Sequence, residues 1–144
     1  MAEPDTIRLL RECDAGVKMG TEAMNKVLED IRNPRFRECL TECRDRHEEL
    51  GKEIRELLSE YGDDGKDPNF IAQGMSWLKT NVMLAIKDSD QTIADLLTDG
   101  CGMGVKSLSR YLNQYGAAAM KARNIAGKLI RLEEKLAADI RPYL

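Results

Sequence analysis

Aromatic residues are scarce in this sequence, making up 5% of its 144 residues, and it holds only four prolines and one histidine. The aromatic residues are among those enriched in β-strands, so their shortage argues against a sheet-rich fold. The longest uninterrupted apolar run, Val82 to Ile86, is far too short to span a bilayer. The first residues, MAEPDTIRLL, lack the basic segment and apolar core of a signal peptide. We therefore expect a cytoplasmic protein.

A strong charge of either sign is also missing. The 22 basic and 25 acidic residues leave a formal net charge of -3. Such a balance provides no strong positive field for binding nucleic acid or an anionic membrane. Neither partner is expected.

The composition that remains favours amphipathic helices. Hydrophobic residues make up 42% of the chain and charged residues 33%, as expected for helices with one apolar stripe and a charged outer face. The length predicts a single domain, residues 1–144, large enough to bury a core. The four cysteines, Cys13, Cys39, Cys43 and Cys101, fall inside helical patterns, which predicts packed thiols, with disulfides as the alternative.

Two amphipathic helices are predicted in the first 61 residues, from apolar residues on alternating steps of three and four. Asp5 can cap the first helix, whose seam is interrupted by Asp14 and Thr21. Asn33 and Pro34 end it and begin the second helix with a capping residue and a first-turn proline, so the two helices should be antiparallel. The seam residues are Ile7, Leu10, Val17, Met24, Leu28 and Ile31, then Phe36, Leu40, Cys43, His47, Leu50, Ile54, Leu57 and Tyr61.

A third helix is predicted over residues 69–87, after the turn-rich segment GDDGKDPN at residues 62–69. It carries apolar residues on two faces, and each face needs a partner. One face can pack on the other helices. The second face, formed by Phe70, Trp77 and Leu84, is either covered by a neighbouring helix or pairs with a second copy of the protein. Of the two we favour the homodimer.

Two more helices are predicted in the last third of the chain. Asp88 and Gln91 resemble a capping box at the start of the fourth helix, and Gly116 ends it. The fifth helix should run from Ala117 to about Arg141, before Pro142. Their inner residues are predicted to be Ile93, Leu97, Leu108, Tyr111 and Tyr115, then Ile125, Leu129, Leu132, Leu136 and Ile140.

The stretches RECDAGVKMGTEA, TECRDRHEELGKEI, GMSWLKTNVMLAI with the acidic DSDQ turn, and LTDGCGMGVKSLSRYL resemble a small bacterial ferritin-like family of unknown function. The order of the helices is also similar to that of the ferritin-like superfamily, which has one long crossover connection. The resemblance covers nearly the whole chain. It implies an all-α, antiparallel four-helix bundle with a shorter fifth helix in the crossover.

Most of the ligands that the resemblance implies are missing from this sequence. Metal-binding members place a Glu on two helices and a Glu-x-x-His on the other two. Here His47 is present, but Arg44 stands three residues before it, and the residues expected to lie level with it are Gly20 and Thr21. The corresponding layer of the last helix, around 122–128, has no histidine. We therefore expect no di-metal centre and no cofactor.

Cys43, His47, Asp99 and Cys101 form the alternative metal or redox site. Cysteine and histidine four residues apart on one helix can share a metal, with further donors from another helix. The competing interpretation, which we prefer, is that small buried thiols and a hydrogen-bonded imidazole simply fill the core.

Glycines form a second unusual pattern. Gly100, Gly102 and Gly104 together cost a helix about 2–3 kcal/mol relative to alanine, and Gly16 and Gly20 lie on the first helix. They predict either a close approach of helices or a pocket for a small or apolar ligand. The pocket residues would be Gly20, Met24, Trp77, Gly100 and Met103, with Met19 beside them.

These observations predict a non-catalytic ferritin-like bundle that acts as a structural or protein-interaction module. No Ser/His/Asp or Cys/His/Asn set supports an enzyme. The alternatives are the metal or redox protein and the carrier of a small molecule.

Overall fold

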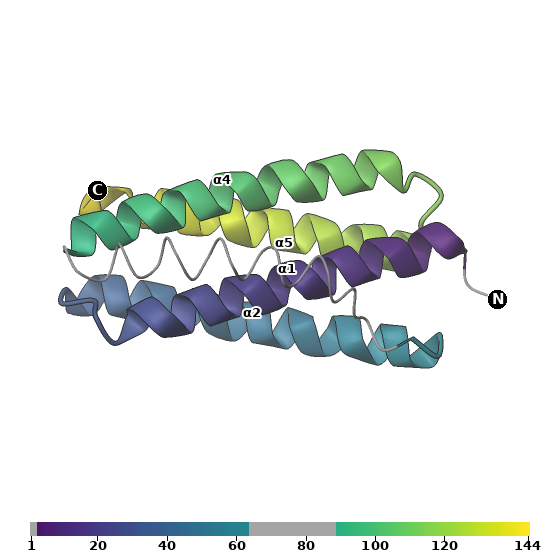
Figure 1. The fold of residues 1–144 in the computed structure, drawn as a ribbon, viewed down its shortest axis with the longest axis horizontal. Coiled ribbons are helices and arrows are strands. Elements are labelled where there is room, and N and C mark those ends of the chain that lie inside the picture. Colours follow the sequence, from purple (N-terminus) through teal and green to yellow (C-terminus); the bar gives the residue numbers. More distant parts are fainter. Residues whose placement is uncertain (1–2, 64–88) are drawn as a thin grey trace.

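The computed structural model describes residues 3–63 and 89–144, and all regular structure in these two ranges is helical. Four long helices lie side by side along the long axis of the molecule (Figure 1). A single 3-10 turn, η1, follows the last of them near the C-terminus. The elements of the described ranges are α1 (Pro4–Leu28), α2 (Pro34–Glu60), α4 (Asp90–Gln114), α5 (Met120–Asp139) and η1 (Arg141–Tyr143).

The helices form two antiparallel hairpins, α1 with α2 and α4 with α5 (Figure 1). At one end of the molecule the Asp90 carboxylate accepts hydrogen bonds from the backbone N–H groups of Arg32 and Asn33, both at 2.8 Å. At the other end the Asp5 carboxylate accepts from the backbone N–H of Ala117 at 3.2 Å. These contacts place the start of α4 beside the start of α2, so α2 and α4 are parallel.

The helix starts confirm the predicted cap at Asn33 and correct the two predicted at Asp5 and Asp88. The Asn33 side chain accepts from the backbone N–H groups of Arg35 and Phe36, as expected for the start of α2. Asp5 does not cap α1, because the helix already begins at Pro4. The Asp5 carboxylate instead accepts a hydrogen bond from the backbone N–H of Ala117.

The two helices of the second hairpin begin at slightly different residues from those predicted. Ser89, rather than Asp88, caps α4 by accepting from the backbone N–H of Thr92. Helix α5 begins at Met120 instead of Ala117, and its first turn has no side-chain cap. The Thr6 hydroxyl of α1 accepts instead from the backbone N–H of Ala119, at 2.8 Å. A group from another helix thus completes this helix start, which no local sequence pattern reveals.

The predicted seams form the core. Most seam residues of the described helices are buried, and they divide into two clusters, one at each end of the molecule. Phe36 is fully buried and its ring stacks on Tyr143 with ring centroids 4.7 Å apart. Tyr111 and Tyr115 are only partly buried. Apolar periodicity therefore located the core of these four helices correctly.

Some predictions fall outside the described residues. The third helix expected over 69–87 lies there, with the homodimer surface of Phe70, Trp77 and Leu84, and these remain predictions. None of the four described helices is both long enough and apolar enough to cross a membrane.

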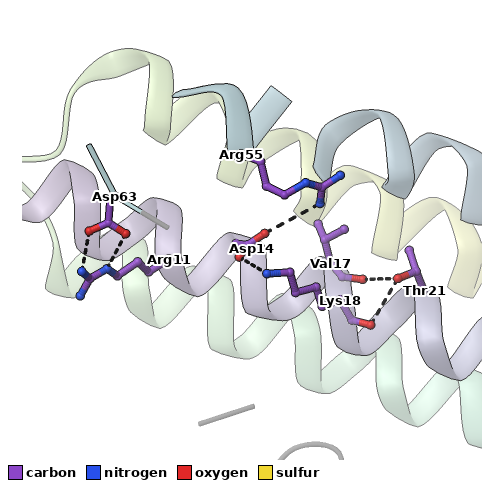
Figure 2. A network of polar contacts seen from close by, with 7 residues as sticks. All are labelled: Arg11, Asp14, Val17, Lys18, Thr21, Arg55 and Asp63. Carbon is purple, nitrogen blue, oxygen red and sulfur yellow. Dashed lines mark hydrogen bonds and ion pairs between the residues drawn. The ribbon is translucent and has the colours of Figure 1, made fainter. Parts of the chain in front are cut away.

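Asp14 is a fully buried carboxylate in the α1 seam, and Figure 2 shows its surroundings. The sequence predicts either that a lysine or hydroxyl across the bundle satisfies it or that it lies near the open end of the bundle with water. Its partner is Lys18 on the same helix, whose ammonium lies 2.7 Å from Oδ2, and the Arg55 guanidinium of α2 lies 4.0 Å from Oδ1. Within the described ranges Oδ1 accepts no hydrogen bond. The pairing therefore balances the charge of Asp14 but leaves one of its oxygens poorly solvated.

Lys18→Met is expected to lower the free energy of unfolding by about 2–3 kcal/mol, since it leaves a buried carboxylate without its closest counter-charge. Urea denaturation at pH 7 measures this loss. Lys26→Met is the matched control, because Lys26 and Glu22 form the same i,i+4 pair on α1 but are 42% and 35% exposed. The control should cost less than about 0.5 kcal/mol. Equal losses in the two variants would contradict a special role for Asp14.

Candidate functional site

A cavity of about 220 Å³ opens between α1 and α4. Its α1 side extends from Glu12 to Met24 and its α4 side from Leu96 to Tyr111, with α2 and α5 contributing residues between them. The lining is mostly apolar. Its members are Glu12, Gly16, Met19, Gly20, Ala23, Met24, His47, Leu96, Leu97, Gly100, Cys101, Met103, Gly104, Ser107, Leu108, Tyr111, Leu129, Glu133 and Leu136.

Four glycines of the lining keep this space open. A Cβ added at Gly16 or at Gly100 would have no described atom within 4 Å. A Cβ at Gly20 would lie 3.8 Å from the His47 ring, and one at Gly104 would lie 3.4 Å from the Glu133 carboxylate. Glycines that allow two helices to pack tightly would instead place a new Cβ against the neighbouring backbone. Of the two interpretations of the glycines, the described residues favour a pocket.

The pocket residues predicted from the sequence are largely brought together. Gly20, Met24 and Gly100 line the cavity. Met103 also lines it but is 49% exposed, which places it at the rim. Trp77 lies outside the described residues. Gly102, from the same glycine-rich stretch, is exposed and is not part of the lining.

His47 lies 1% exposed beneath the cavity, with a hydrogen bond at each ring nitrogen. Nδ1 donates to the backbone carbonyl of Cys43 at 2.8 Å, one turn earlier on α2. Nε2 lies 2.8 Å from Oε1 of Glu133 on α5. Because both partners are acceptors, a ring with a proton on each nitrogen satisfies them together.

The pKa of His47 reflects this geometry. Burial alone lowers the pKa, but the hydrogen bonds of the ring with Cys43 and Glu133 and the charge of Glu133 outweigh burial and raise the pKa to about 10. The ring is therefore an imidazolium at neutral pH and forms a buried ion pair with Glu133. An imidazolium with both nitrogens protonated has no lone pair for a metal.

Two of the buried thiols, Cys13 and Cys101, have raised pKa values. Burial, the charge of Glu133 and a hydrogen bond to it raise the pKa of Cys101 well above its usual range. Burial likewise raises the pKa of Cys13 to about 12, helped by Glu12 and Asp14. The Cys43 sulfur lies 3.5 Å from Nδ1 of His47. Because thiolates are the nucleophiles and the metal ligands, protonated thiols of this kind are unreactive.

A second polar group lies at the opposite end of the cavity. The Tyr111 hydroxyl of α4 donates a hydrogen bond to the Glu12 carboxylate of α1. Burial and the nearby charge of Glu12 raise the pKa of Tyr111 to about 12. Glu12 and Gly20 are eight residues apart, which is about 12 Å along a helix. Since Gly20 lies beside His47, the two polar groups are separated by an apolar stretch.

The structure brings only part of the alternative metal set together. Cys43, His47 and Cys101 are buried close to one another, whereas Asp99 is exposed on α4. Over residues 3–63 and 89–144, no group of three or more His, Cys, Asp and Glu side chains is arranged to hold a metal ion. His47 is hydrogen-bonded in the way that the competing core interpretation predicts.

Sequence reasoning placed His47 correctly beside Gly20 but missed its partner on α5. It expected the corresponding layer of the last helix around residues 122–128, whereas the residue that meets His47 is Glu133. One signal was present: Glu133 follows Leu129 by four residues and precedes Leu136 by three, which places a carboxylate in the apolar seam. The error is about one and a half to three turns of helix in the register between α2 and α5.

Alanine substitutions at two helical glycines should have opposite effects. Gly100→Ala should raise the free energy of unfolding by about 1 kcal/mol, because helix propensity improves and the new methyl group enters the cavity. Gly51→Ala should lower it by about 1–3 kcal/mol, because its Cβ would lie 2.9 Å from Cγ1 of the buried Val17. Thermal and urea denaturation measure both. A loss of stability in Gly100→Ala would indicate that the space beside Gly100 is filled.

No family model, curated protein or solved structure matches this chain.

Proposed function

We propose that this chain is a ferritin-like bundle that holds a small, mainly apolar molecule in the cavity between α1 and α4, without transforming it. The observation that carries this proposal is the space beside Gly16 and Gly100, which no atom of residues 3–63 and 89–144 fills. An apolar cavity of about 150 Å³ is enough to hold benzene. The volume of about 220 Å³ therefore suits a molecule somewhat larger than that.

The ferritin-like part of the proposal is supported by the order of the helices. Two antiparallel hairpins with parallel second and third long helices need one connection that crosses the length of the molecule. Ferritin-like folds differ from simple up-down bundles in this feature.

The non-catalytic part is supported by the polar groups of the lining. His47 is held between two acceptors, and the nearby Cys101 thiol has a raised pKa. A general base needs a free lone pair and a nucleophile needs to be activated. Within the described lining, neither His47 nor Cys101 meets that need.

Ligand-detected NMR and isothermal titration with 1-hexanol test the proposal. The alcohol has seven heavy atoms and no charge, and we expect saturable binding with a Kd of about 1 mM or tighter. Gly100→Leu should abolish binding by filling the cavity. Gly102→Leu is the matched control, because it adds the same side chain to the same helix at an exposed position outside the lining. No binding to the unaltered protein, or equal binding by both variants, would overturn the proposal.

A further inference from the structure

We infer that the ligand of this cavity is a neutral secondary alcohol, whose hydroxyl donates a hydrogen bond to Glu133 and whose two hydrocarbon arms lie beside Gly16 and Gly100. This inference rests on the binding function proposed above and adds the chemical class of the ligand. Three observations carry it: the exposed side of the His47–Glu133 pair, the charge balance of that pair and its position along the cavity.

The carboxylate is the more exposed member of this ion pair in the cavity lining. Glu133 is 18% exposed, whereas His47 is 1% exposed and uses both ring nitrogens in hydrogen bonds. The missing side chain of Gly104 leaves the carboxylate uncovered, since a Cβ added there would lie 3.4 Å from Oε2 of Glu133. Within the described ranges the carboxylate accepts hydrogen bonds from His47 and from the Cys101 thiol, and a carboxylate has about four acceptor positions. Glu133 can therefore accept a further hydrogen bond from a ligand.

The charge balance of the pair favours a neutral donor. The Glu133 carboxylate and the His47 imidazolium lie 2.8 Å apart, so each already has its counter-charge. An ammonium group at Glu133 would lie close to the imidazolium, and a carboxylate ligand would face Glu133 itself, after losing its water. The other carboxylate of the lining, Glu12, is already engaged by the Tyr111 hydroxyl and by a further polar contact. A hydroxyl, which donates a hydrogen bond without carrying a charge, suits Glu133 best.

The pair lies between two open spaces along the cavity. Helices α1 and α4 are antiparallel, because the start of α1 meets the loop after α4 and the loop after α1 meets the start of α4. Gly20 of α1 and Gly104 of α4 lie at the level of the pair, since Cβ atoms added there would contact its side chains. Gly16 and Gly100 each precede these glycines by four residues, so they lie about 6 Å from the pair in opposite directions. A ligand with its polar group in the middle of its chain fills both spaces.

Three uncharged isomers with eight heavy atoms test the inference: 4-heptanol, 1-heptanol and butyl propyl ether. Isothermal titration should show 4-heptanol binding about tenfold or more tightly than the ether, the gain expected from a hydrogen bond to a charged group, because the ether oxygen cannot donate. 1-Heptanol should bind about fourfold or more weakly than 4-heptanol, because its chain extends to one side of the pair and leaves at least one methylene group poorly buried.

NMR of the complex locates the hydroxyl group directly. The CHOH proton of bound 4-heptanol should show a nuclear Overhauser effect to the Cδ2 proton of His47, because Cδ2 is the ring atom that faces Gly20. His47 is the only histidine in the chain, so this proton is identified without further variants. An effect from the terminal methyl groups alone would place the hydroxyl away from the pair and overturn the inference.

Gly104→Ala tests the assignment to Glu133 without removing the ion pair. The new methyl group would lie 3.4 Å from the carboxylate and cover it, while helix propensity improves, so the protein should remain folded. The preference for 4-heptanol over the ether should then fall to about threefold or less. Gly102→Ala is the matched control, because it makes the same change at an exposed position of α4 outside the lining, and it should leave the preference unchanged.

The outcomes separate the two proposals. If butyl propyl ether binds as tightly as 4-heptanol, the alcohol inference fails while the binding cavity stands. If 1-heptanol binds as tightly as 4-heptanol, the placement of the hydroxyl in the middle of the chain is wrong. If Gly104→Ala keeps the full preference, the assignment to Glu133 is wrong. If none of the three isomers binds, the proposed function fails and the inference fails with it.

Discussion

Glu133→Ala is expected to lower the free energy of unfolding by about 3–5 kcal/mol at pH 7, the usual cost of removing one partner of a buried ion pair. The substitution leaves the His47 ring 1% exposed with no acceptor for Nε2, and Glu133 itself is 18% exposed. The ring must then either stay charged without a counter-charge or lose a proton and bury an unsatisfied nitrogen. Urea denaturation followed by circular dichroism measures the loss.

Glu133→Gln is the matched control for this loss. A glutamine carbonyl can still accept from Nε2 of His47 at nearly the same position, so only the charge is removed. We expect a loss of about 1–2 kcal/mol for this variant. If Glu133→Ala costs no more than Glu133→Gln, the hydrogen bond to His47 does not hold the two helices together. A loss below about 1 kcal/mol in both variants would contradict the buried pair itself.

The free energy of unfolding should fall by about 3 kcal/mol between pH 6 and pH 9 because of the proton held by His47, apart from any contribution of other groups. The folded-state pKa of about 10 lies above the ordinary value of 6.5. Below pH 6.5 both the folded and the unfolded protein hold the proton, and the stabilisation is complete. Between pH 6.5 and 10 the unfolded protein loses this proton while the folded protein keeps it, so stability decreases as pH rises. Above pH 10 the contribution is gone.

Two measurements isolate this effect from the titration of other groups. The buried thiols of Cys13 and Cys101 also make the folded protein less stable as pH rises, because burial raises their pKa values. Unfolding curves of the unaltered protein and of Glu133→Gln should therefore be compared, and the variant should show the flatter pH profile. His47 is the only histidine, so its ring protons can be followed by NMR without assignment by mutation. Titration of the ring with a midpoint near 6.5 would contradict the ion pair.

Much of the fold could be predicted from local patterns. The apolar seams located the core faces of α1, α2, α4 and α5, and Asn33 with Pro34 marked the turn of the first hairpin. These features depend on residues within one or two helical turns of each other, so a single sequence contains them. The starts of α1 and α5 were wrong because Asp5 and Thr6 bond to backbone groups of the loop before α5, more than 100 residues away.

The site was predictable in part. Gly20, Met24 and Gly100 were singled out because glycines are costly inside helices, and that cost holds in any fold. His47 was expected to face inward from its place in the apolar seam. Asp99 was wrongly grouped with the buried residues, since it is exposed on α4. Glu133 was missed because its role depends on the register between α2 and α5. These two helices are not joined by a short turn, so the sequence gives no direct guide to how they are aligned.

The sequence by itself therefore determined the long described helices, their inward faces and the presence of a histidine and glycines in the middle layer. Helical periodicity and turn chemistry are local and do not depend on the neighbouring helix. Only the tertiary structure decided that Glu133 pairs with His47 and that Lys18 and Arg55 balance Asp14. It also decided that the described helices leave the space beside Gly16 and Gly100 open. A glycine pattern is compatible with close packing or with a cavity. The separation of α1 and α4 decides between them, and that separation is set by how both helices pack on their hairpin partners.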